Sequence, residues 1–196
     1  MSESEIPSYK IIILGDTGVG KTSLAIRQCR GQFTFQMTPT IGTSHMKAIV
    51  SLGDKKVELK IWDTAGQEQF ASLVSMYARG AQACIMVASF VDPGSLSNLE
   101  TWHERLHATG ENPPIIVAIN KIDMHEGAPM SIEQIRETYG QKFPNMFFVS
   151  ARTGDGVTEL FTSAADEAVR ANESASKGSS KSVNLDDRSN NGGGCC

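Results

Sequence analysis

The sequence predicts an α/β domain with a mostly parallel sheet that carries helices on both faces. Short apolar runs rich in branched residues alternate along the chain with longer segments of helical period, and the first run leads through a glycine-rich loop into a helical segment. This alternation is typical of a parallel sheet with ligands at the carboxyl ends of its strands. A chain of 196 residues, 40% of them hydrophobic, is long enough for one core.

The elements follow from hydrophobic period. Six runs are predicted as strands, namely 9–14, 45–52, 57–62, 83–90, 114–119 and 146–150. The second and third alternate as an edge pair and are joined by a hairpin signal at residues 53–56. Helices are predicted at 21–30, 68–80, 95–109, 131–140 and 156–171. The expected fold is a six-stranded, mostly parallel sheet with one antiparallel edge strand.

Composition divides the chain into three parts. Residues 1–7 are polar and are expected to be a flexible N-terminus without the basic start and apolar run of a secretory signal. Residues 8–171 form the predicted domain. Residues 172–196 hold almost no large apolar side chain, so we expect a disordered tail, which ends in NNGGGCC. A net charge of -4 argues against a nucleic-acid partner.

The loop after the first strand, GDTGVGKT at 15–22, has the spacing of a phosphate-binding loop in the required strand, loop and helix context. Glycines let backbone N–H groups converge on phosphate oxygens, and the helix N-terminus adds partial positive charge. Lys21 is expected to reach the terminal phosphates and Thr22 to place its hydroxyl on Mg²⁺. The loop alone does not select a base.

The base is selected by NKID at 120–123, after the fifth strand. The carboxylate of Asp123 offers two acceptors, which suit the ring N–H and the exocyclic amine of guanine and mismatch adenine. Buried hydrogen-bonding groups reject a mismatched base strongly because they would be left unpaired. The sequence therefore predicts a guanine nucleotide.

The ordered set GDTGVGKT, TPTIGT, WDTAGQEQF, NKID and SAR resembles the Ras superfamily of small GTPases over about residues 8–171. WDTAGQE and the terminal Cys-Cys resemble the Rab branch, and SLVSMYARGAQA is closest to early-endosomal Rabs. The resemblance implies a P-loop GTPase fold and a GTP/GDP switch that recruits effectors to membranes in vesicle trafficking.

The resemblance also implies roles for individual positions. Thr22 and Thr40 would ligate Mg²⁺, with Asp63 near it through water, and Gln67 would orient the attacking water, with Lys21 and Thr40 assisting the slow in-line transfer. The residues expected to contact the nucleotide are Asp16, Thr17, Gly18, Val19, Gly20, Lys21, Thr22, Phe33, Thr40, Gly66, Asn120, Lys121, Asp123, Ser150, Ala151 and Arg152.

The partners implied by the resemblance are an exchange factor, a GTPase-activating protein, effectors and a GDP-dissociation inhibitor. The chain itself is expected to be a monomer. Cys195 and Cys196 are expected to carry two prenyl groups, since one lipid gives only reversible binding and the tail has no polybasic patch. The implied location is the cytoplasmic face of endomembranes, with cycling through the cytosol.

Several positions depart from the family pattern. Thr43, Ser44 and His45 stand where Rabs commonly have Val, Asp and Phe, so a histidine replaces the aromatic residue beside Trp62 and Tyr77; Ala88 and Ser89 replace a Tyr-Asp pair, and Ala78 replaces a second tyrosine. Two alternatives remain. HERLH at 103–107 formally matches a zinc-binding helix, although Pro113 occupies the place of a third histidine. The second is a nucleotide-locked module that binds GTP with little turnover, which Thr17 favours and Gln67 and Thr40 oppose.

Overall fold

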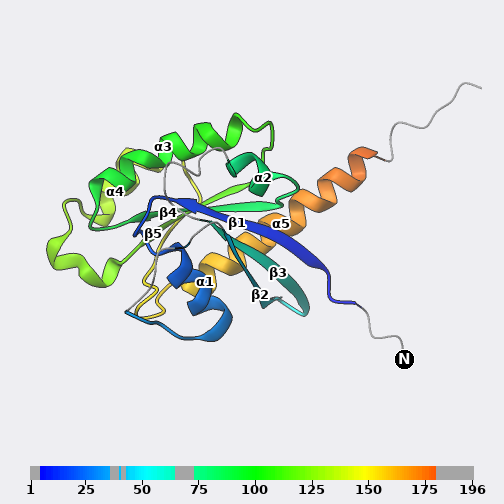
Figure 1. The fold of residues 1–196 in the computed structure, drawn as a ribbon, viewed down its shortest axis with the longest axis horizontal. Coiled ribbons are helices and arrows are strands. Elements are labelled where there is room, and N and C mark those ends of the chain that lie inside the picture. The colour runs from blue at the N-terminus through cyan, green and yellow to red at the C-terminus, as the bar shows by residue number, and fades with distance from the viewer. Residues whose placement is uncertain (1–4, 36–39, 41–42, 65–72, 180–196) are drawn as a thin grey trace, which may run out of the picture.

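The computed structural model describes residues 5–35, 40, 43–64 and 73–179. Its elements run in the order β1 (Ser8–Gly15), α1 (Lys21–Arg30), β2 (Thr43–Leu52), β3 (Lys55–Thr64), α2 (Val74–Ala78), β4 (Ala83–Ser89), α3 (Pro93–His107), β5 (Ile115–Asn120), the 3₁₀ helix η2 (Ile122–Gly127), α4 (Ile132–Tyr139), β6 (Met146–Phe148) and α5 (Val157–Ser179). Figure 1 shows these elements as one sheet with helices on either side.

The sheet has the predicted topology. Its six strands lie in the order β2-β3-β1-β4-β5-β6, and only the β2–β3 pair is antiparallel. A two-residue turn joins that pair at Gly53, whose φ of 59° is left-handed. Glycine takes this conformation without steric cost, so the turn can be this tight. The fold class predicted from the sequence is confirmed.

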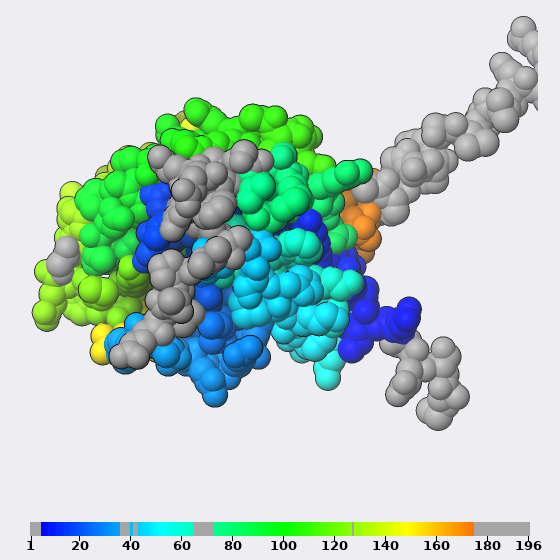
Figure 2. Space-filling model, viewed as in Figure 1, coloured from blue at the N-terminus to red at the C-terminus, as the bar shows by residue number. Residues whose placement is uncertain are grey.

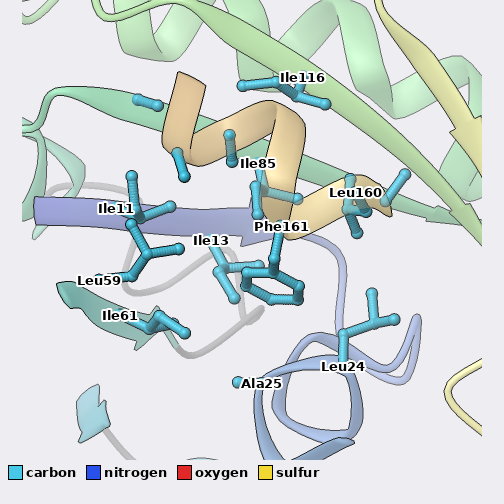
Figure 3. Close-up of a cluster of buried hydrophobic side chains, with 14 of the residues drawn as sticks. Ile11, Ile13, Leu24, Ala25, Leu59, Ile61, Ile85, Ile116, Leu160 and Phe161 are labelled. Carbon is cyan, nitrogen blue, oxygen red and sulfur yellow. The ribbon is translucent and has the colours of Figure 1, made fainter. Parts of the chain in front are cut away.

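A separate core fills each face of the sheet. One core packs α1 and α5 on the sheet, and the other packs α2, α3 and α4 on the opposite face. In Figure 3 the ring of Phe161 from α5 lies against Ile13 of β1, with Ile61 and Ile85 of neighbouring strands on the same face. Both faces of the central strands are buried, which explains why those strands read as continuous apolar runs.

Several helices differ from the prediction at their ends; α3, for example, spans Pro93–His107 where 95–109 was predicted. The helix predicted at 68–80 ends at Ala78, because the chain turns at Gly80 with a φ of 67°. The predicted first residue, 68, lies outside the described residues. The last helix was predicted to end at residue 171, but α5 continues to Ser179. Asn172 accepts a hydrogen bond from Gln82, and extending an existing helix through residues such as Ala and Glu is favourable.

The end of α5 projects beyond the body of the domain, on the side where the N-terminal strand also begins (Figures 1 and 2). The nucleotide-binding motifs lie at the opposite end of the sheet, where β1 and β5 finish. Within the described ranges, no helix has both the length and the apolar character needed to span a bilayer. The fold therefore separates the motif-bearing edge from the end of α5 at Ser179.

Two isoleucines provide a matched test of this core. Ile85 in β4 is fully buried, whereas Ile49 in β2 is 52% exposed. We expect Ile85→Ala to lower the free energy of unfolding by about 2–5 kcal/mol, through lost apolar burial and a residual cavity. Ile49→Ala should cost less than about 1 kcal/mol. Urea unfolding at fixed saturating GDP and Mg²⁺ measures both, and equal losses would contradict the description of the core.

Candidate functional site: a phosphate cradle and a base loop at the strand ends

Residues 15–22, which join β1 to α1, are predicted to bind phosphate, and we call them the phosphate cradle. Gly20 ends the loop as the N-cap of α1 with a φ of 100°, which places the helix N-terminus directly behind it. A Cβ added at Gly20 would lie 2.3 Å from the side-chain nitrogen of Asn120. The loop is therefore both left-handed and tightly packed at this point, and both conditions require glycine. Free N–H groups of a helix N-terminus favour an anion.

Lys21 crosses the mouth of this cradle. Its ammonium donates to the carbonyl oxygens of Gly15 and Asp16 at 2.8 and 2.7 Å, and the residue is only 5% exposed. Burial lowers the pKa of Lys21 to about 8, against the opposing effect of the Asp63 and Asp16 charges. An anionic phosphate beside the ammonium would favour its charged form, as the predicted role of Lys21 requires.

The Asp16 side chain faces helix α3. Its two carboxylate oxygens accept hydrogen bonds from the Asn98 amide and the Trp102 indole, each at 2.8 Å. Asn98 and Trp102 are four residues apart and so share one face of α3. Asp16 was expected to contact the nucleotide. The structure places the Asp16 side chain against α3, and its expected contact with the nucleotide stays a prediction.

Three oxygen-bearing side chains meet beside Lys21. The Thr22 hydroxyl donates to Asp63 Oδ2 at 2.6 Å and lies 2.8 Å from the Thr40 hydroxyl, which itself is 3.3 Å from Asp63 Oδ2. Asp63 Oδ1 is buried and makes no hydrogen bond within the described residues. Burial raises the pKa of Asp63, whereas the Thr22 hydroxyl and the Lys21 charge lower it. Hydroxyl and carboxylate oxygens are what Mg²⁺ prefers, and an unpaired buried oxygen fits a cation's water shell.

The residues predicted to bind the base lie in two segments, 120–123 at the end of β5 and 150–152 after β6. We call these two segments together the base loop. Asn120 donates to Val19 O of the cradle at 2.9 Å and accepts from the Ala151 N–H at 3.0 Å. Asp123 accepts from the Ser150 hydroxyl at 2.6 Å. Asn120 thus joins the two loops, while Ser150 holds the Asp123 carboxylate, which is predicted to bind guanine. Ala151 was expected to contact the nucleotide, and its N–H donates to Asn120 in this structure.

Lys121 and Arg152 sit on the outer side of the base loop. Lys121 has a left-handed φ of 70°, and its ammonium donates to Gly18 O of the cradle at 2.6 Å. The Arg152 guanidinium lies 3.6 Å from the Asp123 carboxylate and 5.3 Å from the centre of the Phe35 ring. Phe35 makes an edge contact with Phe33 at 5.1 Å between ring centres. These contacts bring the predicted base residues and Phe33 to one end of the site.

Comparison with known proteins identifies the relatives of this chain. The Ras family profile matches residues 10–170. The chain is 38% identical to "Ras-related protein Rab5A" of Oryza sativa subsp. japonica, with 81% of this chain and 78% of that protein covered. It is 32% identical to "Ras-related protein Rab-21" of Homo sapiens, with coverage of 96% and 91%.

The chain belongs to the Rab family of Ras-related small GTPases. It is accordingly a GTP hydrolase and a switch in vesicle trafficking, and the alternative of a nucleotide-locked module is not favoured. Binding of guanine nucleotide and Mg²⁺ is a trait of the family. The resemblance stated from the motifs is confirmed. Gly66, Gln67, Cys195 and Cys196 lie outside the described residues, so their roles stay predictions.

Three of the residues that depart from the Rab pattern, His45, Ala88 and Ser89, lie in strands β2 and β4. His45 pairs with Trp62 across the β2–β3 hairpin, and their rings make an edge contact at 5.5 Å. Ala88 and Ser89 end the fully buried strand β4, where the Ser89 N–H donates to the Ser95 hydroxyl of α3 at 2.9 Å. The first departure alters a surface pair, and the second alters the junction of β4 with α3.

The HERLH motif forms the last five residues of α3. His103 and His107 are 4.5 Å apart between ring centres, and His103 also makes an edge contact with Phe143. Burial lowers the pKa of His103, to which the neighbouring His107 also contributes. In the parts of the chain that the structure describes, no three His, Cys, Asp or Glu side chains gather closely enough to hold a metal.

Sequence reasoning missed three residues of this GTPase site: Asn98, Trp102 and Arg27. Arg27 on α1 donates to the carbonyls of Ala151, Arg152 and Gly31. The four-residue spacing of Asn98 and Trp102 could have indicated one helix face. Nothing in the sequence pairs that face with Asp16, and nothing directs Arg27 toward a loop more than 120 positions away. Such contacts depend on the packing of α1 and α3 on the sheet.

Gly20 offers a sharp test of the cradle. In Gly20→Ala the new methyl group would displace the Asn120 amide and break its link to Val19 O, besides straining the backbone. We expect guanine nucleotide affinity to fall by about fivefold or more, from loss of about 1 kcal/mol for the broken hydrogen bond. Isothermal titration with GDP and Mg²⁺ measures this loss.

The matched control is Gly53→Ala in the hairpin turn. Gly53 also has a left-handed φ of 59°, but a Cβ there would meet nothing within 4 Å. It should lower stability by about 1 kcal/mol through backbone strain and leave GDP affinity unchanged. If both variants bind GDP like the unaltered chain, the packing of the cradle on Asn120 has no role in binding.

Proposed function

We propose that this Rab-family GTPase holds GTP and GDP between the cradle at 15–22 and the base loops at 120–123 and 150–152. The observation that carries this assignment is the bridge made by Asn120, which hydrogen-bonds to both loops and is 2% exposed. A single buried amide therefore sets the distance between a phosphate site and a base site. That distance is the dimension that a nucleotide must match.

We propose that Mg²⁺ binds beside the phosphates, held by the hydroxyls of Thr22 and Thr40 and through water by Asp63. The support is the meeting of these three side chains and the unpaired Asp63 Oδ1. When bound, Mg²⁺ neutralises charge on the phosphate oxygens. Lys21 contributes positive charge at the same place, since its ammonium already spans the mouth of the loop.

Hydrolysis transfers the terminal phosphoryl group of GTP to water in line. We propose that Gln67 orients the attacking water and that the Gly66 N–H contacts the terminal phosphate, by analogy with the family pattern in WDTAGQE. Turnover should be slow alone. An activating protein that supplies a positive group in trans accelerates such reactions on the order of 10³–10⁵.

Thr40 gives the switch its physical basis. Its hydroxyl lies between Thr22 and Asp63, so the segment that carries it is tied to the metal site. We propose that loss of the terminal phosphate weakens this tie and releases the segments around 31–45 and 63–78. Effectors and the activating protein would bind the GTP form, and the exchange factor and a dissociation inhibitor the GDP form.

Base selectivity tests the nucleotide assignment. Asp123→Asn replaces one carboxylate acceptor with a donor, so guanine loses a charge-assisted hydrogen bond and xanthine gains a partner. We expect GDP affinity to fall by about ten- to a hundredfold and XDP affinity to rise. Competition against a fluorescent nucleotide measures both.

Asp155→Asn is the matched control for this substitution. Asp155 lies between β6 and α5, in the loop that also carries Ser150, and its carboxylate accepts from the exposed Thr153 hydroxyl at 2.7 Å. It should bind GDP and XDP like the unaltered chain. An Asp123→Asn protein that keeps its preference for GDP would overturn the assignment of the base site.

The tail supports a second proposal, which concerns the membrane. We propose that Cys195 and Cys196 both carry prenyl groups, that the chain works on the cytoplasmic face of endosomal membranes, and that a carrier returns the GDP form through the cytosol. The endosomal part is supported by relatives named Rab5 in rice and tobacco. Two lipids anchor stably, whereas one binds reversibly.

A double substitution tests the anchor. Cys195→Ser together with Cys196→Ser should move the protein from membranes to the soluble fraction of its native cells, because both lipids are lost. Each single variant should be only weakly retained. Fractionation measures the distribution, and mass spectrometry of the terminal peptide counts the lipids. Unmodified thiols together with unchanged membrane binding in the double variant would contradict dual lipidation.

A further inference from the structure

Arg27 links two segments that enclose the base end of the site. Its Nε donates to Ala151 O at 2.8 Å, its Nη1 to Gly31 O at 2.7 Å, and its Nη2 to Arg152 O. The side chain is half-buried and extends from α1. All three nitrogen atoms of one planar group are thus used on backbone carbonyls, which hold segments rather than side chains in place.

The two linked segments have different roles. Ala151 and Arg152 belong to the loop that Asn120 and Asp123 contact. Gly31 ends α1, donates its own N–H back to Arg27 O at 2.9 Å, and begins the segment that carries Phe33, Phe35 and then Thr40. Arg27 therefore connects the base loop to Gly31, where the first of the two proposed switch segments (around 31–45) begins.

A second, outer contact joins the same two segments. The Arg152 guanidinium lies over the Phe35 ring at 5.3 Å, and Phe35 itself is 77% exposed. An exposed cation–ring contact is weak and readily broken. The inner contact through Arg27 carries formal charge on its donors and is partly shielded from water, so it is the stronger of the two.

We infer that Arg27 is a positioning residue that sets the rate at which bound guanine nucleotide is released. A base held between the 150–152 loop and the segment from residue 31 can leave when these two segments separate, and separation breaks hydrogen bonds to Arg27. The inference rests on the proposed nucleotide site. It assigns Arg27 to release and not to base selection, because its donors are bonded to backbone carbonyls.

The test measures dissociation of a fluorescent GDP analogue from the full chain after a chase with excess unlabelled GDP at fixed Mg²⁺. We expect Arg27→Ala to release the analogue about ten- to a hundredfold faster, from loss of hydrogen bonds with a charged donor. Arg27→Lys should be intermediate, since an ammonium can reach one of these carbonyls but not all three. The association rate constant should stay unchanged, which places the loss of affinity in release.

Arg30→Ala is the control, because Arg30 is an exposed arginine on the same helix. It should release GDP at the rate of the unaltered chain. If Arg27→Ala and Arg27→Lys also release at that rate, the inference is overturned. If Arg27→Ala does not fold by circular dichroism, Arg27→Lys decides, and a rate equal to that of Arg30→Ala overturns the inference. An unaltered chain that does not bind the analogue contradicts the proposed function itself.

Discussion

The buried amide of Asn120 is the constraint on which the rest of the site depends. It donates to the cradle at Val19 O and accepts from the Ala151 N–H, so one side chain fixes two loops that are far apart in sequence. Gly20 must lack a side chain because that amide occupies the space. The glycine in the cradle therefore serves the packing of Asn120 as well as the approach of phosphate, and a change in either residue disturbs both loops.

The links around this amide differ in what they leave free. Lys121 ties the base loop to Gly18 O, and the α3 residues Asn98 and Trp102 tie the Asp16 carboxylate. These links hold the cradle and the base loop as one frame. Arg27 attaches that frame to the beginning of the first switch segment. The proposed switch requires the attached segment to move relative to this frame.

The sequence was sufficient for the fold and for the parts of the site that are local in the chain. Branched apolar runs indicated every strand of the sheet, and the loop and NKID lay where strands end. It did not reveal that the Asp16 side chain faces α3, because nothing in the loop sequence indicates that Trp102, 86 positions later, donates a hydrogen bond to it. Nor did it place the end of α5, because composition past 171 is both helix-forming and poor in core residues.

The charges at the centre of the site bear on the proposed binding of nucleotide and Mg²⁺. Burial lowers the pKa of Lys21 and raises that of Asp63, so the protein environment alone disfavours the charged form of each. A phosphate beside Lys21 favours its ammonium, and a cation beside Asp63 favours its carboxylate. Thr22 lies between them and donates to Asp63 at 2.6 Å. The Thr40 hydroxyl shares these contacts, which joins the segment that carries Thr40 to the proposed nucleotide and metal site.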